Sequence, residues 1–302
     1  MSTSSDAPAS PTPVRDLSLL AAVVTVVLWA SAFVGIRAVG DAFSPGPLAL
    51  GRLLVGSLVL GVVAWPRRGP WPRGWTLVQV LGFGALWFGA YNVALNAGEQ
   101  HVDAGTAALL VQLGPILIAV LAGLFLGEGF PRTLVAGIAV AFSGVVLIAL
   151  GSEGGGVGGD RLGALLCVLA AVLYAAGVML QKPALRSLDG LQATWLGCLV
   201  GAAVCLPYLP ALVGEARTAS VGELAGVVYL GVFPTAIAFT TWAYALRRLG
   251  AGRTSATTYL VPAIAVLLSW ALLGETPTAV GFAGGALCLA GVAITRLRRR
   301  AR

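Results

Sequence analysis

Ten apolar segments, each close to 20 residues long, take up most of this 302-residue chain. A helix of about 20 residues crosses the hydrocarbon core of a bilayer. Because lipid offers no hydrogen-bond partners, the backbone of such a segment must satisfy its own groups, as a helix does. The chain is 58% hydrophobic and 10% charged, with a mean hydropathy of +0.91, which is too little polar surface for a water-soluble globule. We predict transmembrane helices near 17–37, 46–65, 75–97, 104–126, 132–150, 162–181, 190–208, 221–245, 254–273 and 278–296.

The same pattern occurs twice, at a constant offset of 147 positions. Residues 109–128 resemble residues 256–275, and the register continues through a glycine-rich segment that follows each copy. Five segments per copy is an odd number, so the second copy must enter the membrane in the opposite direction. The predicted fold is an all-α polytopic membrane protein with ten transmembrane helices in two inverted five-helix repeats. The matching pairs are Gly105/Gly252, Pro115/Pro262, Leu121/Leu268, Leu126/Leu273, Gly127/Gly274, Glu128/Glu275, Gly137/Gly284 and Gly144/Gly291.

The duplication sets the domain boundaries. We expect a disordered cytoplasmic tail at residues 1–16, which are rich in Ser, Pro, Thr and Ala. A first repeat at 17–150 and a second at 161–296 are joined by a flexible Gly-rich linker at 151–160. The chain closes with a basic cytoplasmic tail at 297–302.

The formal net charge of +7 is best explained by membrane topology. With the N-terminus in the cytoplasm, only Arg37, Arg52, Arg161 and Arg217 of the 19 Lys and Arg residues lie within a span or outside. This distribution follows the positive-inside rule and predicts a multi-pass protein of the plasma (cell inner) membrane with both termini cytoplasmic. The basic C-terminal segment then meets anionic lipid, so we expect membrane lipid and no nucleic acid among the partners. A homodimer remains open.

No combination of residues indicates catalysis, a metal or a cofactor. The chain has one histidine, His101, and four cysteines that lie in apolar segments without CxxC spacing. It has no HExxH or GxSxG motif and no nucleotide-binding motif. We therefore expect no enzyme activity and no ATP drive. A secondary carrier, a membrane-embedded enzyme and a channel-like or structural protein are the three hypotheses, and inverted repeats favour the carrier.

The fourth and ninth segments each contain a proline, Pro115 and Pro262, which removes one backbone hydrogen bond and kinks its helix. An inverted repeat places its substrate near the midplane, beside such interruptions. Three residues before each proline, at equivalent positions, stand Gln112 and Tyr259. We therefore predict that both line a substrate cavity.

Further candidate substrate-binding residues surround these positions. They comprise a second equivalent pair, two members of a polar stripe in the third segment, and one aromatic residue of the eighth: Trp29, Tyr174, Tyr91, Asn92 and Trp242. This neutral, aromatic set suits an amphipathic zwitterion or an organic cation held over a ring face, and poorly suits a polyanion. The alternative is that the aromatic residues fill helix interfaces.

The roles of five ionisable residues need separate interpretation. Arg52, Glu99 and His101 could be functional or structural, and Glu99 is a candidate for proton coupling at the end of a span. Glu128 and Glu275 precede prolines that mark helix starts, so we expect them to cap those helices.

These features resemble the EamA-type transporters of the drug/metabolite transporter superfamily. The resemblance rests on the paired five-helix units, on LWASAF at Leu28–Phe33, and on the LGE sequences ending at Glu128 and Glu275. The Gly-rich fifth and tenth segments match as well, and the resemblance covers about Leu17 to Thr295. It implies metabolite efflux, such as amino acid export, by an exporter or exchanger of small molecules.

Overall fold

The structure is a computed structural model that describes residues 17–67, 69–125, 132–150, 159–275 and 278–296. Every regular element in these ranges is helical, which agrees with the predicted all-α class. In the first half the elements are α1 (Ser18–Val39), α2 (Pro45–Ala64), η1 (Trp65–Arg67), α3 (Trp75–Phe83), η2 (Gly84–Ala90), α4 (Tyr91–Glu99), α5 (Ala104–Val111), α6 (Gly114–Phe125) and α7 (Arg132–Leu150). In the second half they are α8 (Gly159–Ala184), α9 (Gly190–Cys205), η3 (Leu206–Tyr208), α10 (Leu209–Thr218), α11 (Val221–Leu230), η4 (Gly231–Ile237), α12 (Ala238–Thr257), α13 (Leu260–Leu273) and α14 (Ala279–Arg296).

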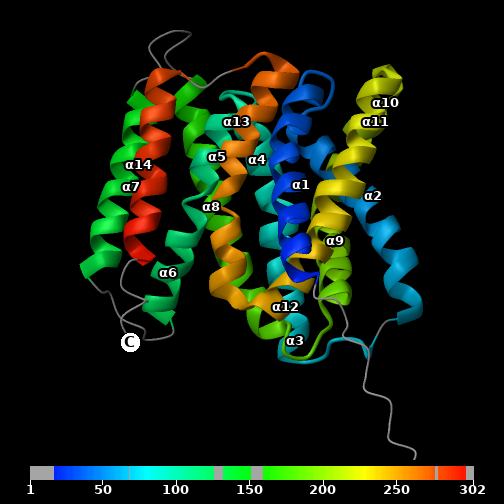
Figure 1. Cartoon of the computed structure of the whole chain (residues 1–302). Coiled ribbons are helices and arrows are strands. Elements are labelled where there is room, and N and C mark those ends of the chain that lie inside the picture. Colours follow the sequence, from blue (N-terminus) through cyan, green and yellow to red (C-terminus); the bar gives the residue numbers. More distant parts are fainter. Residues whose placement is uncertain (1–16, 68, 126–131, 151–158, 276–277, 297–302) are drawn as a thin grey trace, which may run out of the picture.

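The helices form one bundle in which α1 begins and α14 ends at the same, lower end (Figure 1). Within the described ranges, six helical stretches are long and apolar enough to cross a membrane. These are Ser18–Val39, Pro45–Arg67, Trp75–Glu99, Arg161–Ala184, Gly190–Thr218 and Val221–Ala245. Shorter apolar helices cover Ala104–Ile118, Val135–Leu147, Leu260–Leu273 and Ala279–Ile294. The protein is thus a multi-pass membrane protein that sits in lipid.

Two predicted boundaries differ from the structure. The predicted gap between 245 and 254 is absent, because α12 continues to Thr257 and the chain turns only at 258–259. Gly250 and Gly252 lower the helix propensity of this stretch but do not end the helix. Between residues 245 and 261 the sequence has no proline that would remove a backbone N–H donor. After the predicted segment 190–208, the chain continues directly into a further helix, α10.

The predicted tails at 1–16 and 297–302 lie outside the described residues. Of the predicted linker, only Gly159 and Asp160 are described, within α8.

The two halves pack with matching contacts. Helix α1 packs against α12 and α13, and its counterpart α8 packs against α4 and α6. Helices α7 and α14, which correspond to each other, make the most intimate contact of the bundle, beside each other in Figure 1. There the Cys288 thiol donates to the carbonyl of its own counterpart, Ala141, at 3.5 Å. The two halves thus contribute equivalent residues to this contact.

Close approach of α7 and α14 depends on glycine. A Cβ atom added to Gly144 would lie 2.4 Å from the carbonyl oxygen of Gly284. One added to Gly291 would lie 2.5 Å from the carbonyl oxygen of Gly137. Gly137/Gly284 and Gly144/Gly291 are the pairs that the repeat relates, so each half contributes the same two glycines to the contact. Small residues of this kind let membrane helices pack backbone against backbone.

Candidate functional site

The fourth and ninth segments are both interrupted just before their prolines. Helix α5 ends at Val111 and α6 begins at Gly114, while α12 ends at Thr257 and α13 begins at Leu260. Pro262 has no N–H for the Thr258 carbonyl four residues earlier. That carbonyl instead accepts from Val261 N at 3.0 Å and from the Gln112 side-chain amide. Gln112 thereby joins the interruption in one half to the interruption in the other.

The third and eighth segments are interrupted in a different way, each by a seven-residue π-helical stretch. These stretches, η2 and η4, begin 147 positions apart at Gly84 and Gly231. Within η4 the Thr235 hydroxyl donates to the Leu230 carbonyl five residues earlier at 2.8 Å. Wide π turns displace neighbouring side chains and occur frequently at functional sites.

A cavity of about 80 Å³ lies where these four interruptions meet. Much of its lining comes in equivalent pairs from the two halves. Trp87 corresponds to Pro234, Asn92 to Phe239, and Val111 to Thr258, each at the 147 offset, and Trp29 corresponds to Tyr174 at 145. The remaining lining residues are Ala32, Phe33, Arg52, Tyr91, Leu95, Ala108, Gln112 and Val261.

Aromatic rings are prominent in the lining of the cavity and contact one another. The Trp29 ring centroid is 5.0 Å from that of Trp242 and 5.3 Å from that of Phe239. The Trp87 ring is 5.1 Å from Phe239 and 5.2 Å from Tyr174. Edge and tilted ring contacts at these distances stabilise the cluster beyond its buried area. The cavity wall is therefore held in place by rings from both halves.

Arg52 brings a positive charge to the cavity. Its side chain is 5% exposed, and its Nε and Nη2 donate to Thr235 Oγ1 at 3.3 and 3.2 Å. Among the described residues, no carboxylate pairs with it. A buried cation held by a single neutral hydroxyl retains much of its attraction for an anion. Arg52, for which both interpretations stood open, thus lies on the cavity.

The structure brings five of the seven predicted substrate residues onto one cavity: Trp29, Tyr91, Asn92, Gln112 and Tyr174. Trp242 lies behind Trp29, in ring contact with it. Tyr259 does not line the cavity and packs against the apolar cluster that contains Leu113 and Ile116, while its neighbour Thr258 takes the cavity position.

The predicted set of substrate-binding residues did not contain Trp87, Pro234, Phe239 and Thr258. For Thr258 a signal was present, because Pro262 leaves the carbonyl four residues earlier without its helical partner. The 147 offset would have indicated Phe239 and Thr258 as the counterparts of Asn92 and Val111. The Asn92 side-chain amide lines the cavity and donates to the Phe88 carbonyl, one turn earlier in the chain, at 2.7 Å.

Glu275 does not cap the helix that follows it, contrary to prediction. The Thr278 hydroxyl accepts from Gly281 N at 3.0 Å at the start of α14, because Thr278 directly precedes that helix. The Glu275 carboxylate instead accepts from Arg37. Glu128 lies outside the described residues. Within the part of the chain that is described, no group of three His, Cys, Asp or Glu side chains could hold a metal ion.

Comparison with known proteins agrees with this architecture. Residues 16–150 and 161–297 each match the EamA-like transporter family. A protein of Streptantibioticus cattleyicolor described as a probable terminal-alkyne amino-acid exporter is 40% identical over 278 residues, 92% of this chain and 93% of that protein. The uncharacterized transporter YdfC of Bacillus subtilis is 36% identical over 273 residues, 90% and 88% of the two chains. A solved crystal structure 24% identical in sequence superposes with a TM-score of 0.61, covering 95% of this chain and 100% of its own.

Proposed function

The chain belongs to the EamA-like transporter family, and from that premise we propose that it is a secondary carrier that exports amino acids by alternating access. As a transporter it binds a small-molecule substrate, and the cavity between the two halves is the proposed site. Trp29, Tyr91, Asn92, Gln112 and Tyr174 bind the substrate there, and Trp242 supports Trp29 from behind.

The inverted arrangement of two five-helix repeats, ten spans in all, is supported by the direction of the helices. The last turn of α1 lies beside the end of α4, where Arg37 Nη1 donates to the Glu99 carbonyl at 3.2 Å. The first turns of α8 lie beside the same end of α4, since a Cβ on Gly98 would be 3.2 Å from the Gly163 carbonyl. Thus α8 begins where its counterpart α1 ends. Repeats related in this way exchange exposure of a midplane site between the two sides.

The substrate class follows from the buried Arg52 guanidinium in a cavity that is also lined by aromatic rings, and this observation carries the proposal. A guanidinium binds a carboxylate strongly and with defined geometry. The faces of Trp29, Tyr91 and Tyr174 provide sites for an ammonium group by cation–π attraction. An amino acid carries both groups on one carbon. An organic cation would be repelled by Arg52, and a polyanion would need more than this one lining cation.

Counterflow in proteoliposomes tests this function. Because a relative is described as an exporter of terminal-alkyne amino acids, the probe is L-propargylglycine, compared with its saturated counterpart L-norvaline. Vesicles loaded with unlabelled probe should transiently accumulate labelled probe above equilibrium, since only a carrier exchanges one molecule for another. Downhill entry without accumulation would indicate a channel. Saturable accumulation of an organic cation such as tetraphenylphosphonium, with no response to either amino acid, would overturn the substrate class.

The protein's orientation is proposed with both termini in the cytoplasm, following the positive-inside rule. Gly214, in α10, is exposed at the end of the bundle where Glu215 binds Ser44, and Arg73 is exposed at the opposite end. In intact cells an impermeant maleimide should therefore label Gly214→Cys and leave Arg73→Cys unlabelled until the cells are broken. The four native cysteines are buried, so background labelling should be low. The reverse pattern would invert the assigned topology.

A further inference from the structure

A second cavity, of about 140 Å³, lies at the end of the bundle away from the start of α1. It is enclosed by the last turn of α1, the loop that follows it, the first turn of α2 and the last turn of α4. Asn96 and Glu99 of α4 line it and are 2% and 1% exposed. A carboxyl group so far removed from water is costly unless something compensates its charge.

All the unsatisfied atoms of these two side chains are hydrogen-bond acceptors. Among the described residues, Glu99 Oε1 and Oε2 and Asn96 Oδ1 have no hydrogen-bond partner, whereas Asn96 Nδ2 donates to the Pro45 carbonyl at 3.0 Å. The two residues are three positions apart on one helix, so their side chains are neighbours. One proton on Glu99 supplies a hydroxyl that can donate to Asn96 Oδ1, which satisfies acceptors on both side chains. The unpartnered acceptors in this cavity therefore favour a protonated Glu99 carboxyl group.

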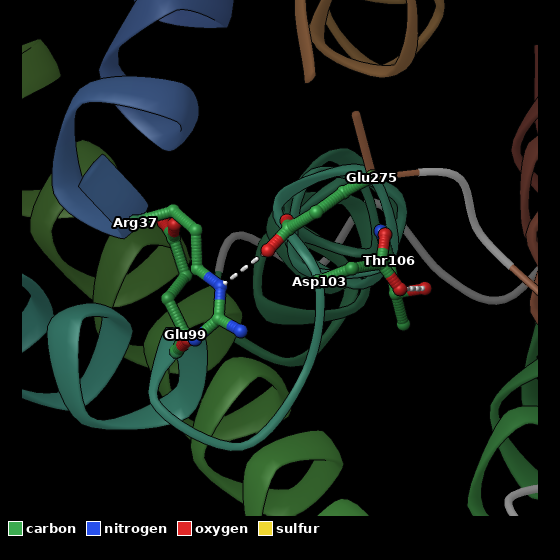
Figure 2. A network of polar contacts seen from close by, with 5 residues as sticks. All are labelled: Arg37, Glu99, Asp103, Thr106 and Glu275. Carbon is green, nitrogen blue, oxygen red and sulfur yellow. Dashed lines mark hydrogen bonds and ion pairs between the residues drawn. The ribbon is translucent and has the colours of Figure 1, made fainter. Parts of the chain in front are cut away.

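Arg37 connects this carboxyl group to another part of the bundle. Its Nε donates to Glu275 Oε1 at 2.9 Å, and its Nη1 donates to the backbone carbonyl of Glu99 at 3.2 Å. Figure 2 shows the guanidinium between the two glutamates, with the ion pair to Glu275 formed. This pair ties the end of α1 to the end of α13. An ionised Glu99 would compete for the same guanidinium.

Arg52 and Arg37 both attract the Glu99 carboxylate, and of these two cations Arg37 is the one that lines this cavity. Asp41 lines the cavity and adds a like charge, while Arg52 of α2 lies on the substrate cavity and is bonded to Thr235. Asp103 is occupied as the cap of α5, accepting from Thr106 N at 2.9 Å and from Thr106 Oγ1 at 2.6 Å (Figure 2). His101 lies two positions further along the chain and is half-buried.

We propose that Glu99 is the proton-binding site that couples transport to proton entry, and that its protonation closes the outer end of the protein. This rests on the proposed carrier function. A proton from outside binds a Glu99 oxygen, Arg37 stays with Glu275, and α1 and α13 remain tied. When the proton leaves toward the cytoplasm, the Glu99 carboxylate draws Arg37 away and the outer end is released. Export and proton entry are thereby linked as an antiport.

A distance measurement in nanodiscs tests the switch without any substrate. Spin labels on Ala38→Cys and Ala279→Cys, both at exposed positions of the outer end, report the separation of the end of α1 from the start of α14. The distance should be short at acidic pH and longer at alkaline pH. Glu99→Gln, which cannot ionise, should stay short at both, and Glu275→Gln should stay long. A wild-type distance that ignores pH, or a Glu99→Gln variant that still responds, would overturn the proposal.

The matched control is Glu223→Gln, since Glu223 closes a capping box with Ser220 that glutamine also satisfies. In proteoliposomes, the ratio of L-propargylglycine efflux with and without an inward proton gradient should fall to one in Glu99→Gln and keep its wild-type value in Glu223→Gln. If wild-type vesicles show no counterflow, the proposed substrate is wrong. The spin-label result still decides the role of Glu99.

Discussion

Replacing Arg52 with glutamine should nearly eliminate amino acid transport while leaving a folded protein. The change removes the cation proposed to bind the substrate carboxylate, and glutamine can still bond Thr235. Losing one partner of a buried, hydrogen-bonded charge pair costs about 2 to 5 kcal/mol. Since each 1.4 kcal/mol is a factor of ten, we expect the apparent affinity for L-propargylglycine to fall roughly 30-fold to a few thousand-fold. Counterflow over a range of substrate concentrations measures it.

Arg67→Gln is the matched control, because Arg67 is exposed beyond the end of α2 and its side chain donates a hydrogen bond to the Val63 carbonyl of its own helix at 3.5 Å. It should transport as wild type does. Arg52→Lys keeps the charge but loses the planar fork, so it should be intermediate. Normal amino acid affinity in a folded Arg52→Gln protein would contradict the carboxylate assignment. Improved transport of tetraphenylphosphonium by the same variant would support it, because the repulsive charge is gone.

Substituting valine for Gly144 should strongly destabilise the bundle. The first added carbon would lie 2.4 Å from the Gly284 carbonyl oxygen and 2.9 Å from both the amide nitrogen and the sulfur of Cys288. Two of these three atoms are helix backbone, which cannot move aside without separating α7 from α14. Overpacking of this kind typically costs up to about 3 kcal/mol, and the rigid neighbours place Gly144→Val at that upper end. The melting temperature in detergent should fall by many degrees, and Gly291→Val should behave alike.

Gly214→Ala is the control for this effect, since nothing lies within 4 Å of an added Cβ there. Gly214 is inside α10, so alanine should raise helix stability by about 0.5 to 1 kcal/mol. If Gly144→Val lowers the melting temperature and Gly214→Ala raises it, the effect at Gly144 comes from close packing and not from helix propensity. Equal melting temperatures for Gly144→Val and wild type would mean that α7 and α14 are not in backbone contact in the membrane.

Family membership could be identified from the sequence, and the match over both halves confirms it. Helix boundaries were less accurate, because hydropathy reports the length of apolar chain and not where a backbone hydrogen bond is lost. The π-helical stretches η2 and η4 illustrate this, since Trp87, Phe88 and Pro234 lie in apolar surroundings that look uniformly helical. Only their occurrence at the same offset in both halves marks them as features of the repeat.

By itself the sequence determined that this chain is helical, duplicated and embedded in lipid. Those properties depend on local apolar length and on a register that can be counted along the chain. Tertiary structure decided that Thr258 and not Tyr259 lines the cavity, that Arg52 lies beside the aromatic rings, and that Arg37 binds Glu275. Each of these depends on how far a helix is rotated about its own axis. That rotation is set by packing against helices far away in sequence, and a shift of one residue turns a side chain by about 100°.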